Sequence, residues 1–113
     1  MDYDVVVVGA GPGGSMTAKC LADEGVDVLL VEKRPEIGTP VRCGEGTGYP
    51  GLKKHGIELK KEFVARTLKG YNIYAPDGTR VSVPYSEPHS VILERRIFDK
   101  YLAIKAAKAG AEV

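Results

Sequence analysis

The pattern of hydrophobic and polar residues at the start of the chain predicts a strand, a turn, a helix and a second strand. Val5 to Val8 form an unbroken β-branched run, which is typical of a parallel strand buried on both faces. A helix is predicted from about Gly13 to Glu24, and Gly25 follows where a C-terminal cap is expected. A second apolar strand runs from Val28 to Val31. The pattern predicts a βαβ unit whose helix packs through Met16, Ala18, Cys20, Leu21 and Ala22.

Residues 33–93 are predicted to form an excursion from that unit. Glycine and proline are frequent from 33 to 56, so regular structure is not expected there beyond a short helical turn at about 50–55. The later part of the excursion alternates apolar and polar residues, and Pro76-Asp77-Gly78 is a turn signal between two paired strands. The strands expected there are 64–75, 79–85 and 91–93, with Tyr71, Tyr74 and Tyr85 packing within them.

A second helix is predicted over 95–108, capped by Gly110. Residues 111–113 then begin a third parallel strand, which we place beside the first. The apolar face of this helix is expected to comprise Ile97, Phe98, Tyr101, Leu102, Ala106 and Ala109. Its other side carries Lys100, Lys105 and Lys108, which indicate a solvated face or, as the alternative, a surface that contacts a membrane. Because the chain stops as this strand begins, we expect it to be the N-terminal piece of a longer protein.

A glycine-rich turn joins the first strand to the first helix. Gly9-x-Gly11-x-x-Gly14 provides a sharp turn, a backbone that a phosphate can approach, and close packing of helix on strand. The N-terminus of a helix attracts anions, so this turn predicts a site for a dinucleotide pyrophosphate. The alternative is an ordinary βαβ unit whose glycines only tighten the turn.

An acidic residue ends the second strand. Glu32 follows Gly9 by 23 positions, where a carboxylate meets the ribose hydroxyls of bound adenosine. Lys33 and Arg34 could accept a 2′-phosphate, but Glu32 would repel one. The sequence therefore favours a plain adenosine ribose, as in FAD or NAD.

The loop from Pro40 to Gly46 combines charged residues, a cysteine and glycines. Such a loop could wrap a phosphate or a polarised ring, or it could be a solvated surface loop. Cys43 is a candidate for redox or proton-transfer chemistry because Arg42 beside it favours a thiolate. The alternative is that Cys43 is a small residue that fits a tight loop.

Composition narrows the class of protein. The 113 residues are 43% hydrophobic and 27% charged with a net charge of +1, which argues against nucleic acid as a partner. No apolar stretch reaches the roughly 20 residues of a spanning helix, and Met1-Asp2 begins no signal peptide. We expect a reduced, cytoplasmic setting from the two cysteines. His55 and His89 share no ligand spacing with the cysteines, so no metal site is expected.

Four segments, 4–15, 31–38, 40–46 and 93–100, occur in an order that resembles a known family. That family is the geranylgeranyl reductases, in particular the archaeal digeranylgeranylglycerophospholipid reductases, which are flavoproteins related to hydroxylases similar to p-hydroxybenzoate hydroxylase. The loop Arg42-Cys43-Gly44-Glu45-Gly46 is the part of the resemblance that is specific to the reductases. The resemblance implies an α/β fold: a Rossmann-like FAD-binding βαβ unit with an inserted β-rich excursion at 33–93, forming an incomplete part of a larger two-domain flavoprotein. Residues 1–113 are then the N-terminal part of its FAD-binding domain.

The resemblance also implies a function and a set of site residues. The implied reaction is hydrogenation of isoprenoid C=C bonds in membrane-lipid precursors, with an unidentified electron donor and possible peripheral contact with the membrane. A flavin-dependent aromatic hydroxylase and a non-catalytic dinucleotide-binding fragment are the alternatives. Arg95 is expected to reach the flavin phosphate or ribityl region, and Cys43 is the catalytic candidate. The residues implied to bind FAD are Gly9, Gly11, Pro12, Gly13, Gly14, Ser15, Glu32, Lys33, Arg42, Cys43, Gly44 and Arg95.

Overall fold

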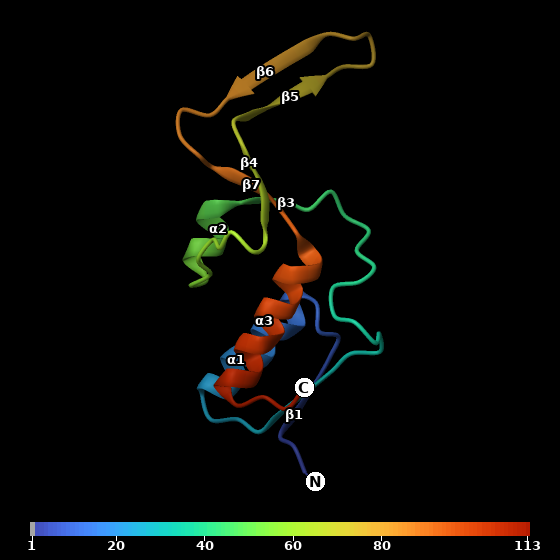
Figure 1. The fold of residues 1–113 in the computed structure, drawn as a ribbon, viewed down its shortest axis with the longest axis vertical. Helices are drawn as coiled ribbons and strands as arrows, with labels where there is room; N and C mark the ends of the chain where they lie inside the picture. The colour runs from blue at the N-terminus through green and yellow to red at the C-terminus, as the bar shows by residue number, and fades with distance from the viewer. Residues whose placement is uncertain (1) are drawn as a thin grey trace. The chain divides into compact units, whose positions relative to one another are not determined.

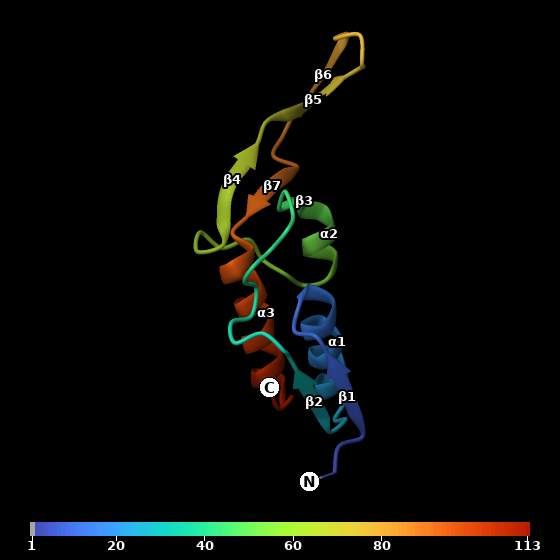
Figure 2. The same cartoon turned by 90° about the vertical axis from the view of Figure 1, so that its right-hand side faces the viewer.

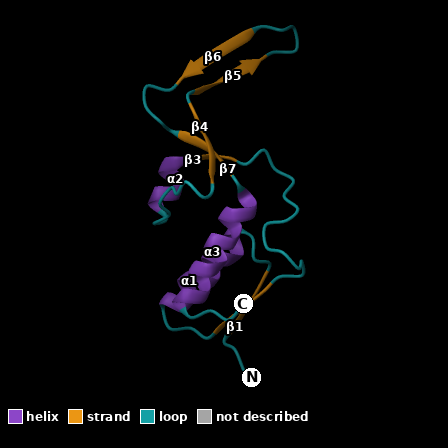
Figure 3. Ribbon diagram, viewed as in Figure 1, coloured by secondary structure: helices purple, strands orange, loops and turns teal. Residues whose placement is uncertain are grey.

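The computed structural model describes residues 2–113, which form two compact units. One unit contains the chain up to Arg42 together with Arg95–Val113, and we call it the α/β unit. The other unit, Cys43–Glu94, is called the β unit. The α/β unit is mainly helical, while most of the strands belong to the β unit (Figure 3).

The α/β unit is built on two parallel strands and two helices. β1 (Val5–Val8) pairs in register with β2 (Val28–Val31), and α1 (Pro12–Asp23) connects them. α3 (Arg95–Ala109) lies alongside α1 (Figures 1 and 2). Small and branched residues close the shared core: Ala10, Ala18, Val28, Leu30, Ala106 and Ala111. The predicted βαβ unit and the second helix are confirmed.

The third parallel segment lies beside β2, not beside the first strand as predicted. Leu29 and Glu112 form a parallel bridge. The Leu30 N–H donates to the Glu112 carbonyl oxygen at 2.7 Å, and the Glu112 N–H donates to the Val28 carbonyl oxygen at 2.9 Å. Right-handed crossovers whose helices lie on the same face of a sheet step in the same direction. Because α3 lies alongside α1, the chain continues past β2 and cannot return to β1.

β1 is covered on one face only, which corrects the expectation of a strand buried on both faces. Val6 is 53% exposed and Val8 is 83% exposed, whereas Val28 and Leu30 of β2 are buried. α1 and α3 pack beside one another, and nothing among residues 2–113 covers the side of the sheet that carries Val6 and Val8. A run of valines reflects β propensity as well as burial, so it cannot show how many faces are covered.

The buried faces of both helices match the predicted ones in part, since Ala18, Phe98, Leu102 and Ala106 are buried as predicted. α1 buries Ser15 and Ala18, while Cys20 is exposed, so the predicted core packing of Cys20 is wrong. Small residues allow α1 to approach its neighbours closely. α3 buries Phe98, Asp99, Leu102, Ala103 and Ala106, and it leaves Ile97 exposed.

The β unit contains a three-stranded antiparallel sheet and a separate hairpin. The sheet has the order β3-β7-β4, and β5 pairs with β6 in the hairpin. The bounds are β3 (Gly46–Gly48), α2 (Tyr49–Lys54), β4 (Val64–Leu68), β5 (Gly70–Tyr74), β6 (Arg80–Pro84) and β7 (Ser90–Leu93). The helical turn and the strand at 91–93 are confirmed, and β3 was not predicted.

The strand predicted over 64–75 is two strands that belong to different sheets. The chain turns at Gly70, whose φ is +150°, and an added Cβ there would lie 2.5 Å from the Val83 carbonyl oxygen. Only glycine fits this close approach. The hairpin turn at 76–78 is confirmed, because the Ala75 N–H donates to the Thr79 carbonyl oxygen at 2.8 Å.

The tyrosines of the hairpin are less buried than predicted. Tyr71 is 48% exposed and Tyr74 is 63% exposed, so the packing role expected for them is wrong. Tyr85 is partly buried, and its ring centroid lies 6.0 Å from that of Tyr71. The position of a tyrosine in a predicted strand does not show whether another element covers that strand. Among the described residues, none packs over the hairpin as a second layer.

The loop after β2 packs closely against the first turn of α3. Gly38 has a φ of +80°, and an added Cβ would lie 2.9 Å from the Arg95 carbonyl oxygen and 3.0 Å from Cβ of Asp99. Lys100 pairs with Glu36, so this lysine is not part of the purely solvated face expected from the sequence. The loop is therefore attached to α3 by a steric fit and by an ion pair.

We predict that Gly38→Ala destabilises the protein more than Gly25→Ala. Both glycines have a φ of +80°, so each substitution carries the left-handed strain of about 1–2 kcal/mol. Only Gly38 adds a clash with backbone, because a Cβ at Gly25 would meet nothing within 4 Å. Overpacking adds about 1–3 kcal/mol. Denaturant unfolding of the full-length protein measures the difference, and equal losses in the two variants would refute the steric fit.

Candidate functional site

The glycine turn lies at the carboxyl end of β1 and is shaped by backbone contacts. Gly9 has a φ of +101°, and its N–H donates to the Val31 carbonyl oxygen at 2.7 Å. A Cβ on Gly14 would lie 1.8 Å from the Gly9 carbonyl oxygen, so no side chain is possible at that position. In contrast, a Cβ on Gly11 or Gly13 would meet nothing within 4 Å. The turn is tight against the protein at Gly14 and open at Gly11.

The N-terminus of α1 has no side-chain cap. Gly11 is the N-cap residue, Pro12 begins the helix, and the first turn contains no acidic residue. The first N–H groups of a helix have no acceptor one turn earlier, and the helix dipole places partial positive charge at that end. Ser15 is buried, and its Oγ donates to the Ala10 carbonyl oxygen at 3.3 Å. This end of α1 suits an anion such as a pyrophosphate.

Glu32 is hydrogen-bonded directly to the glycine turn. Its Oε2 accepts from the Ala10 N–H at 2.9 Å, and its Oε1 accepts from the Arg34 N–H at 3.0 Å. These two hydrogen bonds, that from Arg34 first, lower the pKa of Glu32 from its usual value. The carboxylate is therefore ionised at neutral pH and held at a fixed place beside the turn. The sequence predicted the proximity of Glu32 to the turn, but not the hydrogen bond that fixes it.

The basic residues after Glu32 differ in their contacts. Lys33 is exposed. Arg34 donates from Nη1 to the Pro40 carbonyl oxygen at 2.7 Å, which ties the two ends of the loop together. Arg34 therefore has a structural contact within its own loop, in addition to the charge that the sequence suggested for a 2′-phosphate.

Arg95 begins α3 and forms a forked ion pair that the sequence did not predict. Its Nε donates to Asp99 Oδ1 at 2.7 Å, and its Nη2 donates to Asp99 Oδ2 at 3.1 Å. Asp99 is 3% exposed. The only available signal for this pair was the i,i+4 spacing of Arg95 and Asp99, which is common on helix surfaces. The burial of Asp99 distinguishes this ion pair from the common i,i+4 pairs on helix surfaces.

The residues of the Arg42-Cys43-Gly44 loop are exposed and lie where the two units join in the sequence. Arg42 is the last residue of this part of the α/β unit, and Cys43 and Gly44 begin the β unit. Cys43 Sγ accepts from the Glu45 N–H at 3.3 Å, and Glu45 has a φ of +62°. The Leu93 N–H donates to the Glu45 carbonyl oxygen at 2.8 Å, so this part of the loop is fixed to β7. The structure thus groups the turn, Glu32, Lys33 and Arg95 in one unit and describes Cys43 and Gly44 in the other.

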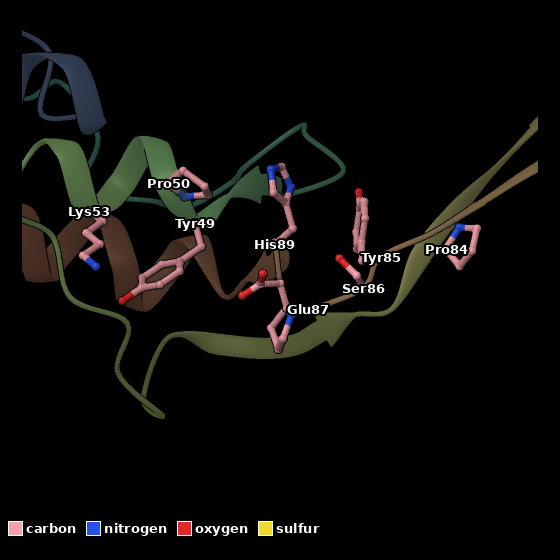
Figure 4. A pocket seen from close by; sticks show the side chains of 9 residues that line it. Tyr49, Pro50, Lys53, Pro84, Tyr85, Ser86, Glu87 and His89 are labelled. Carbon is pink, nitrogen blue, oxygen red and sulfur yellow. The ribbon is translucent and has the colours of Figure 1, made fainter.

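A separate pocket of about 600 Å³ lies within the β unit (Figure 4). Its lining combines aromatic, proline and charged side chains: Tyr49, Pro50, Lys53, Pro84, Tyr85, Ser86, Glu87, Pro88 and His89. The rings of Tyr85 and His89 have centroids 5.3 Å apart, and both side chains lie within 3.3 Å of Ser90 Oγ. None of the residues that line this pocket was a predicted site residue.

Among residues 2–113, no three His, Cys, Asp or Glu side chains gather in a way that could hold a metal ion. No helix in this part of the chain combines the length and the apolar character that crossing a membrane requires.

Comparison with known proteins relates the glycine turn to flavin-binding proteins. A model of the FAD binding domain family matches residues 2–47. A digeranylgeranylglycerophospholipid reductase of Methanosarcina acetivorans is 53% identical over 98% of this chain and 28% of its own length. The protein of the same name from Methanocaldococcus jannaschii is 50% identical over the same shares. The chain spans less than a third of the length of these relatives.

Solved structures agree with the sequence relatives. A geranylgeranyl bacteriochlorophyll reductase-like protein from Thermoplasma acidophilum matches with a TM-score of 0.93 and 46% identity, over 98% of this chain and 29% of that chain. A mutant of the halogenase PltM in complex with FAD matches with a TM-score of 0.73 over 99% of this chain and 27% of that chain, and at 22% identity it shows the fold alone. The resemblance to the reductases and the α/β FAD-binding fold are confirmed. FAD is confirmed as the cofactor at the level of the domain family.

We predict that Glu32→Gln flattens the dependence of stability on pH in the acid range. The pKa of Glu32 in the folded protein is lowered from its ordinary value of 4.5. Its stabilising contribution is therefore complete above that value and is lost as the pH falls through the lower folded pKa. Unfolding free energies measured from about pH 6 to pH 3 should fall less steeply in Glu32→Gln than in the wild type. Glu58→Gln, at an exposed position, should keep the wild-type slope; identical slopes for all three proteins would contradict the prediction.

Proposed function

Because this chain is a relative of the N-terminal segment of the digeranylgeranylglycerophospholipid reductases, we propose that it is the FAD-binding part of a reductase that hydrogenates isoprenoid C=C bonds in membrane-lipid precursors. The observation that carries this proposal is the glycine turn joined to an ionised Glu32 in a chain about half identical to those reductases. Residues 1–113 then form the N-terminal part of an FAD-binding domain, with 33–93 as an excursion within it.

The described residues fit the adenosine and pyrophosphate portions of FAD. The open side of Gly11, the uncapped start of α1 and the absence of acidic residues in its first turn support the pyrophosphate. Pro12, Gly13 and Ser15 complete this backbone cradle. Glu32 accepts hydrogen bonds from the adenosine ribose, and Lys33 flanks it. The residue types and their hydrogen bonds support this assignment.

Arg42, Cys43 and Gly44 are proposed to lie along the flavin portion. When bound, FAD supplies the redox chemistry of the reaction, in which a hydride adds to one alkene carbon and a proton to the other. We assign that proton to Cys43: its thiol hydrogen goes to the second carbon, the thiolate that Arg42 favours is the state left after the transfer, and the thiol is then restored by a proton from solvent. The exposed position of Cys43 supports this role, because a proton donor must be accessible to the substrate.

The partners follow from this reaction. The substrate is an isoprenoid lipid, and a separate electron donor must reduce FAD in each cycle. We propose a cytoplasmic protein that contacts the membrane peripherally, where its lipid substrate resides. The two free thiols, Cys20 and Cys43, support a reducing compartment.

We predict that Gly11→Ala weakens FAD binding about tenfold or more without unfolding the protein. The φ of Gly11 is −73°, which alanine adopts readily, and the added methyl group would meet no protein atom. It would instead occupy the space through which the pyrophosphate approaches the backbone. Titration of the full-length apoprotein with FAD, followed by flavin fluorescence, gives the dissociation constant. Gly51→Ala adds a methyl group at another open helical position and should bind like the wild type; equal affinity in Gly11→Ala would contradict the cradle.

The reaction and the role of Cys43 are tested together. The full-length protein, reduced anaerobically and mixed with a geranylgeranyl lipid, should yield a product with saturated C=C bonds by mass spectrometry. At saturating FAD, Cys43→Ala should slow this conversion by about 10²-fold or more, as for loss of a general acid. Cys20→Ala, which removes the other exposed thiol, should react at the wild-type rate. A product with added oxygen that forms only when O2 is admitted to the reduced protein would favour a hydroxylase instead, and undiminished rates in Cys43→Ala would remove its catalytic assignment.

A further inference from the structure

Asp99 is a buried carboxylate whose two oxygens both accept hydrogen bonds from one guanidinium. It is 3% exposed, and it accepts from Arg95 Nε at 2.7 Å and from Arg95 Nη2 at 3.1 Å. Aspartate is seldom fully buried, and burial of an ion pair brings a desolvation cost. Lys19 and Asp23 have the same i,i+4 spacing on α1, but their side chains are 30% and 47% exposed. The pair on α3 is therefore not an ordinary surface ion pair.

The pair lies at the end of the α/β unit that carries the glycine turn. α1 begins just after the carboxyl end of β1, and α3 runs back to a segment parallel to β2. The first turns of both helices therefore lie at the carboxyl edge of the sheet, where ligands bind in open α/β folds. Arg95 is the first residue of α3, and Asp99 is one turn further along it.

The loop that follows Glu32 supports the pair from the same edge. Gly38 leaves no room for a side chain between this loop and Asp99, since its own Cβ would lie 3.0 Å from that of Asp99. Glu36 pairs with Lys100, the residue after Asp99. The carboxylate that faces the glycine turn and the carboxylate that holds Arg95 are thus joined by one packed loop.

We infer that Asp99 is a positioning residue that fixes the Arg95 guanidinium toward the anionic part of a dinucleotide bound at the glycine turn; this inference rests on the proposed FAD site. The pair is neutral overall, so it does not attract an anion through net charge. The pair instead orients the arginine. A planar guanidinium held through two hydrogen bonds keeps its other N–H donors pointing in one direction. A ligand then binds a donor that is already ordered.

The sign of the change in affinity of Asp99→Asn separates orientation from charge. Removal of the carboxylate adds one unit of net positive charge at the start of α3, which by itself would tighten the binding of an anion. If Asp99 orients Arg95, affinity falls instead, by about tenfold, equivalent to ~1.4 kcal/mol. FAD and ADP are titrated into the full-length apoprotein, and thermal stability is measured for each variant. Asp23→Asn removes a carboxylate from the exposed pair on α1 and should leave both dissociation constants unchanged.

Two further variants keep the test decisive if Asp99→Asn does not fold. Asp99→Glu retains the negative charge but displaces the carboxylate by one methylene group. Arg95→Lys retains the positive charge but loses the two parallel N–H donors of the guanidinium. Both should weaken FAD binding, and the two changes together should weaken it less than the sum of their separate effects, because they disrupt one interaction. Unchanged or tighter binding in the Asp99 variants, even with lower thermal stability, would overturn the inference. A wild-type protein that does not bind FAD would overturn the proposed cofactor itself, whatever the Asp99 variants do.

Discussion

The arrangement of the candidate site depends on the close approach of α1 to the end of β1. An added Cβ on Gly14 would lie 1.8 Å from the Gly9 carbonyl oxygen, so the first turn of the helix rests directly on the backbone of the glycine turn. This contact aims the start of α1 at the carboxyl edge of the sheet, and Gly9, at a φ of +101°, makes the reversal that permits it. A side chain at Gly14 would push α1 away and move the N–H groups to which we assign the pyrophosphate.

Glu32 connects the glycine turn after the first strand to the rest of the α/β unit. Its carboxylate connects the Ala10 N–H of the turn to the Arg34 N–H of the following loop. That loop is fixed in turn to α3, through the packing of Gly38 and the pairing of Glu36 with Lys100. A ligand that engages both the turn and the first residue of α3 would therefore meet two elements already connected through the loop after β2.

Local pattern predicted the elements of the α/β unit, and tertiary packing decided the features that the pattern missed. The strand, glycine turn and helix could be predicted because each depends on spacing within a few residues, and Glu32 because it ends the second strand at a characteristic distance from Gly9. The exposure of Val8 and of Cys20 could not, because it depends on which neighbouring layers cover the sheet and the helix. The place of the third strand likewise depended on the face over which α3 returns. Asp99 was missed because a charged residue in a helix ordinarily indicates solvent.

The contacts of Glu32 and Arg34 add to the argument for a plain ribose over a 2′-phosphate. The sequence favoured the plain ribose on charge alone. Two backbone N–H groups lower the pKa of Glu32, so its negative charge persists at neutral pH beside the place where the proposed adenosine site would hold a 2′-phosphate. Of the two nearby cations, Lys33 is exposed, and Arg34 donates to the Pro40 carbonyl oxygen within its own loop. A phosphate there would face a fixed carboxylate and would have to compete with that contact for the guanidinium. An adenosine with free ribose hydroxyls, as in FAD, is not repelled by the Glu32 carboxylate. Its hydroxyl groups can instead donate hydrogen bonds to that carboxylate.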